Sequence, residues 1–253
     1  SKINEIWYSK KYSLDLPYKN TTDYKFHKWK IVWERISFYF KGQENINFLD
    51  VGAGQGWATE FLREKFKNFN SFSIEQSQSC IEYIRDILKG NVINVSIESK
   101  WPDYCKNKFD LVILRHTLEH LLDPKFVLKQ IKESLNKNGG VVYLAVPNIN
   151  GSPYMNLLND TLRPVHLAYY SVNTFLKLTQ EVGLYPIAFG CEGEIWGLFN
   201  TKKSVSEIKL DRNYKFQRKF ILDMLKRQHF NNYKVKLKLF IKRFLIKINI
   251  LKK

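Results

Sequence analysis

The sequence lacks the features of several protein classes. No run of apolar residues approaches the roughly 20 that a membrane-spanning helix needs. The first twenty residues mix charged and scattered apolar residues and show no signal-peptide pattern. The three cysteines are far apart and odd in number, which excludes a disulfide framework and a CxxC metal knuckle. Such sparse cysteine usage favours a reducing, cytoplasmic location.

Acidic residues are scarce in only one part of the chain. The 41 Lys and Arg residues outnumber the 24 Asp and Glu residues, giving a net charge of +17. Residues 201–253 hold 17 basic and 3 acidic residues, a net charge of +14, so residues 1–200 carry only +3. The excess charge therefore concerns the partner of a tail, not the chemistry of the body. The 44% apolar content excludes a disordered chain.

The basic tail has the pattern of an amphipathic helix. Over residues 234–248 the apolar side chains recur at helical spacing, and most lysines lie away from that stripe. This pattern is typical of a helix that lies on a membrane surface, here the inner face. Packing on the body or against a second copy in a homodimer is the plainer alternative. Nucleic-acid binding is a third and less favoured one.

The alternation of strand and helix patterns predicts an α/β fold. Short apolar runs predict strands over residues 46–51, 71–75, 92–97, 109–114, 141–146, 185–190 and 194–199. Helical patterns lie between them, over residues 57–67, 78–89, 124–136 and 172–182. This order predicts a Rossmann-like, seven-stranded, mostly parallel sheet with helices on both faces and the last two strands antiparallel.

We expect additions at both ends of this sheet domain. Aromatic residues recur at helical spacing from Asp23 to Phe40 and predict a helix that packs on the main domain. The predicted division is a helical cap over residues 1–44, the α/β domain over residues 45–200, and a basic helical tail over residues 201–253.

A glycine-rich turn after the first predicted strand is the strongest functional signal. Glycines permit positive φ and a close approach of the backbone to a ligand; here they are Gly52, Gly54 and Gly56. The dinucleotide fingerprint would require a third glycine where Trp57 stands. Asp50 would repel a pyrophosphate and suits a ligand with an ammonium group. Glu75 ends the next strand, where an acid can accept both hydroxyls of a ribose.

At these residues the sequence resembles the class I S-adenosylmethionine-dependent methyltransferases, over about residues 40–200. The resemblance implies S-adenosylmethionine as cofactor, bound at Asp50, the three glycines and Glu75. It also places Gln76 against the adenine, and Ile97 and Glu98 near the adenine amine. We add Arg115 to these expected cofactor residues, although its segment would also line the acceptor side.

Three further segments resemble one branch of that family, which has an HxLEH stretch after the fourth strand. They are residues 109–124, residues 139–148 and His166. The resemblance implies an O-methyltransferase acting on small molecules, such as sugars and precursors of surface or capsular polysaccharide. Residues 114–117 read Leu-Arg-His-Thr and lack the Asn/Asp-Pro-Pro-Tyr/Phe stretch of base N-methyltransferases. Arg163 and Tyr154 lie in segments that would line the acceptor side.

The histidines permit several interpretations. On a helix, His116, Glu119 and His120 would share one face, which is metal-ligand spacing. A zinc peptidase would leave the glycine turn and Glu75 without a role. A small-RNA ribose methyltransferase family holds a metal with ExxEH and a later histidine, but His116 stands where that family has Glu. Three histidines and one carboxylate would suit Zn²⁺ or Mn²⁺ better than Mg²⁺.

We favour a metal-free site in which His120 or His166 is the general base, because histidine has a suitable pKa. A purely structural role for these histidines is the third option. The sequence therefore predicts methyl transfer from S-adenosylmethionine to an oxygen of a small, anionic acceptor, such as a sugar nucleotide or a phosphoramidate precursor of a capsule. The alternative is an RNA-directed ribose methyltransferase, or an RNA-binding protein that uses the basic tail.

Overall fold

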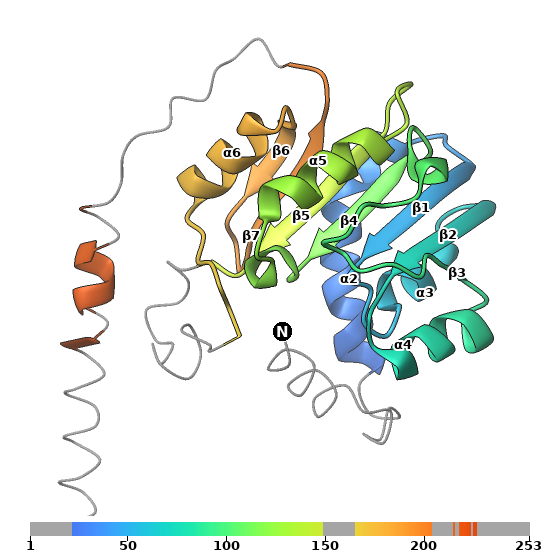
Figure 1. Ribbon diagram of the computed structural model, residues 1–253, viewed down its shortest axis with the longest axis horizontal. Helices are drawn as coiled ribbons and strands as arrows, with labels where there is room; N and C mark the ends of the chain where they lie inside the picture. The colour runs from blue at the N-terminus through green and yellow to red at the C-terminus, as the bar shows by residue number, and fades with distance from the viewer. Residues whose placement is uncertain (1–21, 149–164, 204–214, 216–217, 224, 227–253) are drawn as a thin grey trace, which may run out of the picture.

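A computed structural model describes residues 22–148, 165–203, 215, 218–223 and 225–226. The predicted tail helix over residues 234–248 and two expected acceptor-side residues, Tyr154 and Arg163, lie outside these ranges. The described chain forms one seven-stranded sheet with the strand order β3-β2-β1-β4-β5-β7-β6 (Figure 1). All neighbours pair in parallel except β5 with β7 and β6 with β7. The predicted fold class is therefore confirmed.

The strands are β1 Asn45–Val51, β2 Asn68–Ile74, β3 Asn91–Val92, β4 Leu111–Arg115, β5 Val141–Val146, β6 Tyr185–Gly190 and β7 Ile195–Asn200. The helices are α2 Thr22–Ile36, α3 Trp57–Arg63, α4 Gln78–Glu82, α5 Pro124–Ser134 and α6 Val172–Glu181. Short 3₁₀ turns include Ser37–Phe40 after α2 and Leu118–His120 after β4.

Helices cover both faces of the sheet because each central strand is apolar on both sides (Figure 1). On one face, α2 and α3 pack with Phe48 and Tyr143 in one apolar core. On the other face, α5 and α6 pack with Leu49 and Leu144 in a second core. Every residue of Val141–Val146 is buried, as expected for a strand between two helical layers.

The predicted N-terminal helix is confirmed. Its apolar stripe points into the core, with Trp29, Val32, Ile36 and Phe40 all buried. The predicted start of the last helix is also confirmed. The side chain of Ser171 accepts a hydrogen bond from the backbone N–H of Thr174. The hydroxyl of Thr174 in turn accepts one from the backbone N–H of Ser171, and the pair forms a capping box.

One predicted strand is wrong, and one interpretation of the histidine spacing does not apply. The strand expected over residues 92–97 has only two residues, because the N–H of Val95 bonds back to the carbonyl of Ile93 and draws the chain off the sheet. The HxLEH stretch is not an α-helix. His116 still extends the β4–β5 ladder through the carbonyl of Ala145, and only the 3₁₀ turn Leu118–His120 follows before α5 begins at Pro124.

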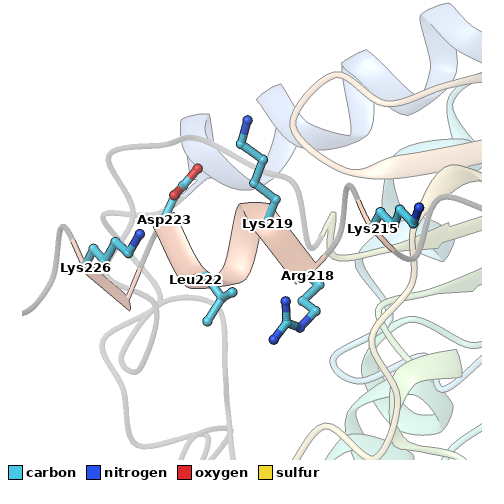
Figure 2. Close-up of a pocket in the computed structure, with 6 residues that line it drawn as sticks. All are labelled: Lys215, Arg218, Lys219, Leu222, Asp223 and Lys226. Atoms are coloured by element: carbon cyan, nitrogen blue, oxygen red, sulfur yellow. The ribbon is translucent and has the colours of Figure 1, made fainter.

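The tail is described in part. Six tail residues line a hollow of about 630 Å³. Figure 2 shows them as Lys215, Arg218, Lys219, Leu222, Asp223 and Lys226. All the lining residues belong to the tail and none to the sheet, so this hollow is separate from the site described below. Within the described ranges, every helix is too short or too polar to cross a bilayer.

Candidate functional site

The predicted site residues gather at one edge of the sheet, where the parallel strands end. The glycine turn follows β1, Glu75 follows β2, and the histidine stretch follows β4. The strand order reverses between β1 and β4, because β2 and β3 lie to one side of β1 and β5 lies beyond β4. Ligands of open α/β sheets bind at such a switch point. The topology therefore brings together residues that the sequence separates by as many as 68 positions, from Gly52 to His120.

The glycine turn needs its glycines. Gly52, Gly54 and Gly56 all have positive φ, at 72°, 53° and 70°. A Cβ on Gly52 would stand 2.8 Å from Cγ2 of Thr117 and still closer to its hydroxyl. A Cβ on Gly54 would meet no heavy atom within 4 Å. The turn is thus closed by protein at Gly52 and has open space beside Gly54.

Glu75 is held at the mouth of this turn by three backbone N–H groups. Its Oε2 accepts from Gly54 at 2.7 Å, and its Oε1 accepts from Gln76 and Ser77 at 2.8 Å each. Because these donors belong to the turn after β1 and to the start of the next loop, the carboxylate links the two segments.

Asp50 is a buried carboxyl group near the end of β1, with 4% of its surface exposed. Burial and, to a smaller extent, the charge of Glu75 raise the pKa of Asp50 to about 8. A positively charged ligand beside Asp50 would favour its ionised carboxylate over the neutral acid. Asp50 and Glu75 therefore make this edge of the sheet favourable for a cation.

The expected adenine-side residues lie beside one another. The amide of Gln76 donates to the hydroxyl of Ser96 at 2.9 Å. Oε1 of Glu98 accepts from the backbone N–H groups of Leu122 and Asp123, at 2.7 and 2.8 Å. Ile97 packs partly buried against the core. Glu98 thus ties the loop after β3 to the loop after β4.

Arg115 contacts a residue that sequence reasoning missed. Glu194, just before β7, is buried and binds Arg35, Arg115 and His116. The distances are 2.7 Å to Nη1 of Arg35, 2.9 Å to Nη2 of Arg115 and 2.8 Å to Nε2 of His116. Arg115, expected at the cofactor, therefore forms an ion pair with Glu194. Glu194 lies 79 and 159 residues from its arginine partners, so no local spacing could reveal it.

The pKa values in this cluster reflect its charges. Burial alone would raise the pKa of Glu194, but the hydrogen bond from His116 and the charge of Arg115 lower it to about 2. Burial would lower the pKa of His116, but hydrogen bonds to Glu119 and Glu194 outweigh burial and raise it. His116 has a left-handed backbone with φ of 53°, a rare conformation for a non-glycine residue.

The structure brings His120 and His166 together with Glu119. The two imidazole rings lie 4.9 Å apart at an angle of 69°. Nδ1 of His120 is 2.8 Å from the carbonyl of Val165, and its Nε2 is 3.7 Å from Oε1 of Glu119. The carbonyl of Glu119 accepts the N–H groups of Leu167 and Ala168, which fixes the chain around His166.

Known proteins with similar sequences include methyltransferases that act on different acceptors. The chain is 27% identical over 139 residues to a ubiquinone biosynthesis O-methyltransferase from Pelagibacter ubique. The aligned region covers 54% of this chain and 52% of that protein. It is 31% identical over 104 residues to an (S)-coclaurine N-methyltransferase from Thalictrum flavum, covering 38% of this chain and 28% of that one. The chain thus spans about half or less of these relatives.

A solved structure shows the same fold. An S-adenosylmethionine-dependent methyltransferase from Clostridium acetobutylicum superposes with a TM-score of 0.54 at 16% identity, covering 80% of this chain and 98% of that one. Residues 23–188 match a protein family described as a methyltransferase domain. That match spans α2, the glycine turn and the histidine stretch. The chain therefore belongs to the methyltransferase domain family, among the class I S-adenosylmethionine-dependent methyltransferases.

Proposed function

We propose that the protein transfers a methyl group from S-adenosylmethionine to an oxygen of a small, anionic acceptor. One observation carries the proposal: the side chain of Thr117 packs against the backbone of Gly52. The turn that would hold the cofactor therefore touches the stretch that leads into Glu119 and His120. A methyl donor and a proton-accepting cluster are both needed at one place for O-methylation, because proximity supplies much of the rate.

The residues present fit this cofactor. Glu75 is a carboxylate beside the glycine turn, and a cationic ligand would also favour the ionised form of Asp50. The cofactor carries a sulfonium and an ammonium group, and the space beside Gly54 is open. We assign Gly52, Gly54, Gly56 and Asp50 to the amino-acid end and Glu75 to the ribose. Gln76, Ile97 and Glu98 are assigned to the adenine. S-adenosylmethionine supplies an electrophilic methyl group when it is bound.

The protein's own groups then act on the acceptor. We assign the reacting oxygen to the cluster of His120 and His166, the two residues that the sequence predicts as catalytic. An acceptor hydroxyl loses its proton as the bond to the methyl carbon forms. We assign this loss of the proton to the position beside the two histidines. Glu119, whose side chain is only 2% exposed, places a carboxyl group next to both rings.

Positive charge beside the cluster supports an anionic acceptor. Arg35, Arg115 and His116 surround Glu194, so three groups that can carry positive charge share one carboxylate. His116 is the most exposed of them, with 38% of its side chain accessible. A phosphate or carboxylate on the acceptor is the chemical group that such a cluster attracts.

The acceptor class rests on the sequence resemblance. We retain a sugar nucleotide or a phosphoramidate precursor of surface or capsular polysaccharide as the proposed acceptor. The basic tail is proposed to contact a membrane surface or a second copy, and the cytoplasm is the proposed location.

A screen of acceptors tests this function. The full chain, with labelled S-adenosylmethionine, is offered nucleotide-linked sugars, sugar phosphates, the matched neutral sugars and a single-stranded RNA. We expect transfer to an anionic sugar derivative, with the matched neutral sugar at least tenfold slower. Transfer to RNA alone, or preference for the neutral sugar, would refute the proposed acceptor class.

A further inference from the structure

We propose that Glu119, His120 and His166 form a binding site for one divalent transition-metal ion, Zn²⁺ or Mn²⁺. The sequence alone favoured a metal-free pair of histidines, and the family assignment names no metal. Binding of the ion follows from the geometry of these three residues. Its catalytic role rests on the proposed function.

The three side chains present one ligand atom each to a common point. A carboxylate oxygen of Glu119 and one ring nitrogen from each histidine all lie within 4.8 Å of one another. With metal–ligand bonds of roughly 2.0–2.2 Å, ligand atoms around one ion lie about 3–4 Å apart. Small side-chain rotations therefore suffice to bring all three atoms into one coordination sphere.

The orientation of His120 is set by the backbone. Its Nδ1 is 2.8 Å from the carbonyl oxygen of Val165, so this nitrogen carries the hydrogen and donates. In the neutral ring, Nε2 then keeps its lone pair, and it lies 3.7 Å from Oε1 of Glu119. Metal-binding histidines are commonly fixed in this way, with the second ring nitrogen bonded to a carbonyl.

The burial of Glu119 is a second, independent observation. The residue is 1% exposed, and its Oε2 is buried without a hydrogen-bond partner among the residues that the structure describes. A buried carboxylate oxygen without a partner is costly, since its solvation is lost and not replaced. A cation bound between Glu119 and the two imidazoles removes that cost.

His116 does not belong to this site, although its spacing in the sequence suggests it. Its Nδ1 lies 3.6 Å from Oε1 of Glu119, but its Nε2 is committed to Oε2 of Glu194 at 2.8 Å. Its ligand atoms are not among those of Glu119, His120 and His166 that lie within 4.8 Å of one another. Two imidazoles and one carboxylate are the ligands of open Zn²⁺ sites and also suit Mn²⁺, whereas Mg²⁺ and Ca²⁺ prefer oxygen ligands. Three protein ligands leave at least one position free.

That free position gives the ion a role in methyl transfer. With their nitrogens bound to the ion, His120 and His166 would act as ligands in place of a general base. An acceptor hydroxyl bound at the free position would have a lower pKa and would lose its proton to water more readily. During transfer the O–H and S–C bonds break and the O–C bond forms. The sulfonium becomes a neutral thioether, so charge and atoms balance without a redox partner.

Calorimetric titration of the metal-depleted full chain with Zn²⁺, and separately with Mn²⁺, tests the site without any substrate. We expect one ion per chain. Glu119→Gln, His120→Ala and His166→Ala should each weaken binding by roughly 100-fold or more, as loss of a ligand exceeds loss of an outer partner. His27→Ala is the matched control, because His27 is an exposed histidine on α2 and should bind as wild type.

Circular dichroism confirms folding of each variant, and His166→Ala serves if the buried Glu119→Gln variant does not fold. Absence of binding below millimolar ion, or wild-type affinity in the folded ligand variants, would overturn the site. One bound ion with full methyl transfer after chelation would overturn its catalytic role. One bound ion with no methyl transfer to any acceptor would leave the metal site standing and count against the proposed function alone.

Discussion

Thr117 occupies the space into which a side chain on Gly52 would point. A Cβ there would lie 2.8 Å from Cγ2 of Thr117. This contact joins the turn after β1 to the stretch after β4, which are the two halves of the proposed site. Their relative position therefore depends on the absence of a side chain at residue 52.

We predict that Gly52→Ala destabilises the protein by roughly 2–5 kcal/mol, from left-handed strain and overpacking together. The double variant Gly52→Ala, Thr117→Ala should recover part of the lost stability. The hydroxyl and methyl of Thr117 are then gone, and only the contact of 3.2 Å between the new Cβ and the Cβ of residue 117 persists. Gly54→Ala is the control with strain alone, since its Cβ meets open space. Urea denaturation of the four proteins measures this, and equal losses at residues 52 and 54 would contradict the role of the contact.

Glu194 should be a major source of stability above pH 5. Glu194→Gln leaves Arg35 and Arg115 partly buried without a counter-charge, so we expect a loss of about 3–5 kcal/mol at pH 7. The pKa of Glu194 is about 2 in the folded protein and near 4.5 in the unfolded chain. Its contribution is thus present above pH 4.5 and disappears as the pH falls toward 2.

The difference in unfolding free energy between wild type and Glu194→Gln should therefore shrink between pH 5 and pH 3. Glu44→Gln is the matched control, because Glu44 pairs with Lys67 on the surface, and its loss should stay within about 1 kcal/mol. A pH-independent difference at residue 194 would count against the ion cluster.

Asp50 should make both stability and cofactor affinity depend on pH. Its folded pKa of about 8 lies above the ordinary value of 3.8 for an aspartate, so its favourable contribution is complete below pH 4 and is lost as the pH rises through 8. A cationic cofactor favours the carboxylate, so S-adenosylmethionine affinity should rise from pH 6 to pH 8, with release of a proton. Calorimetry in two buffers of different ionisation enthalpy measures that proton, and Asp50→Asn should abolish its release.

Deletion of residues 201–253 removes a net charge of +14. We expect S-adenosylmethionine affinity to change by no more than a few fold, because every proposed cofactor residue lies between positions 50 and 115. Anionic vesicles and size-exclusion chromatography then test the tail's proposed partners, a membrane surface and a second copy. Loss of all soluble expression would instead make the tail part of the folded core.

The sequence predicts the fold well because its signals are local. Alternating strands and helices define the sheet, and Ser171 or Gly52 can be interpreted from their immediate neighbours. The strand at residues 92–97 fails because apolar composition cannot reveal the hydrogen bond between Val95 and Ile93 that ends the pairing. The HxLEH helix fails because His116 is still paired with β5, which spacing alone does not show.

The site is predicted less completely because it depends on contacts between distant segments. Glu194 joins α2, β4 and β7 and carries no motif of its own. The approach of His166 to His120 depends on hydrogen bonds from residues 167 and 168 to the carbonyl of Glu119, which is a purely tertiary feature. The assigned roles of the cofactor residues and of both histidines stay predictions.

Calorimetric binding of S-adenosylmethionine to wild type and to Glu75→Ala tests the central claim most directly, with NADH as the competing nucleotide. We predict that wild type binds S-adenosylmethionine and not NADH. Glu75→Ala should lose roughly 1.5–3 kcal/mol of binding free energy, the scale of hydrogen bonds to a charged group, while the exposed control Glu64→Ala binds as wild type. Binding of NADH without S-adenosylmethionine, or unchanged affinity in Glu75→Ala, would contradict the account.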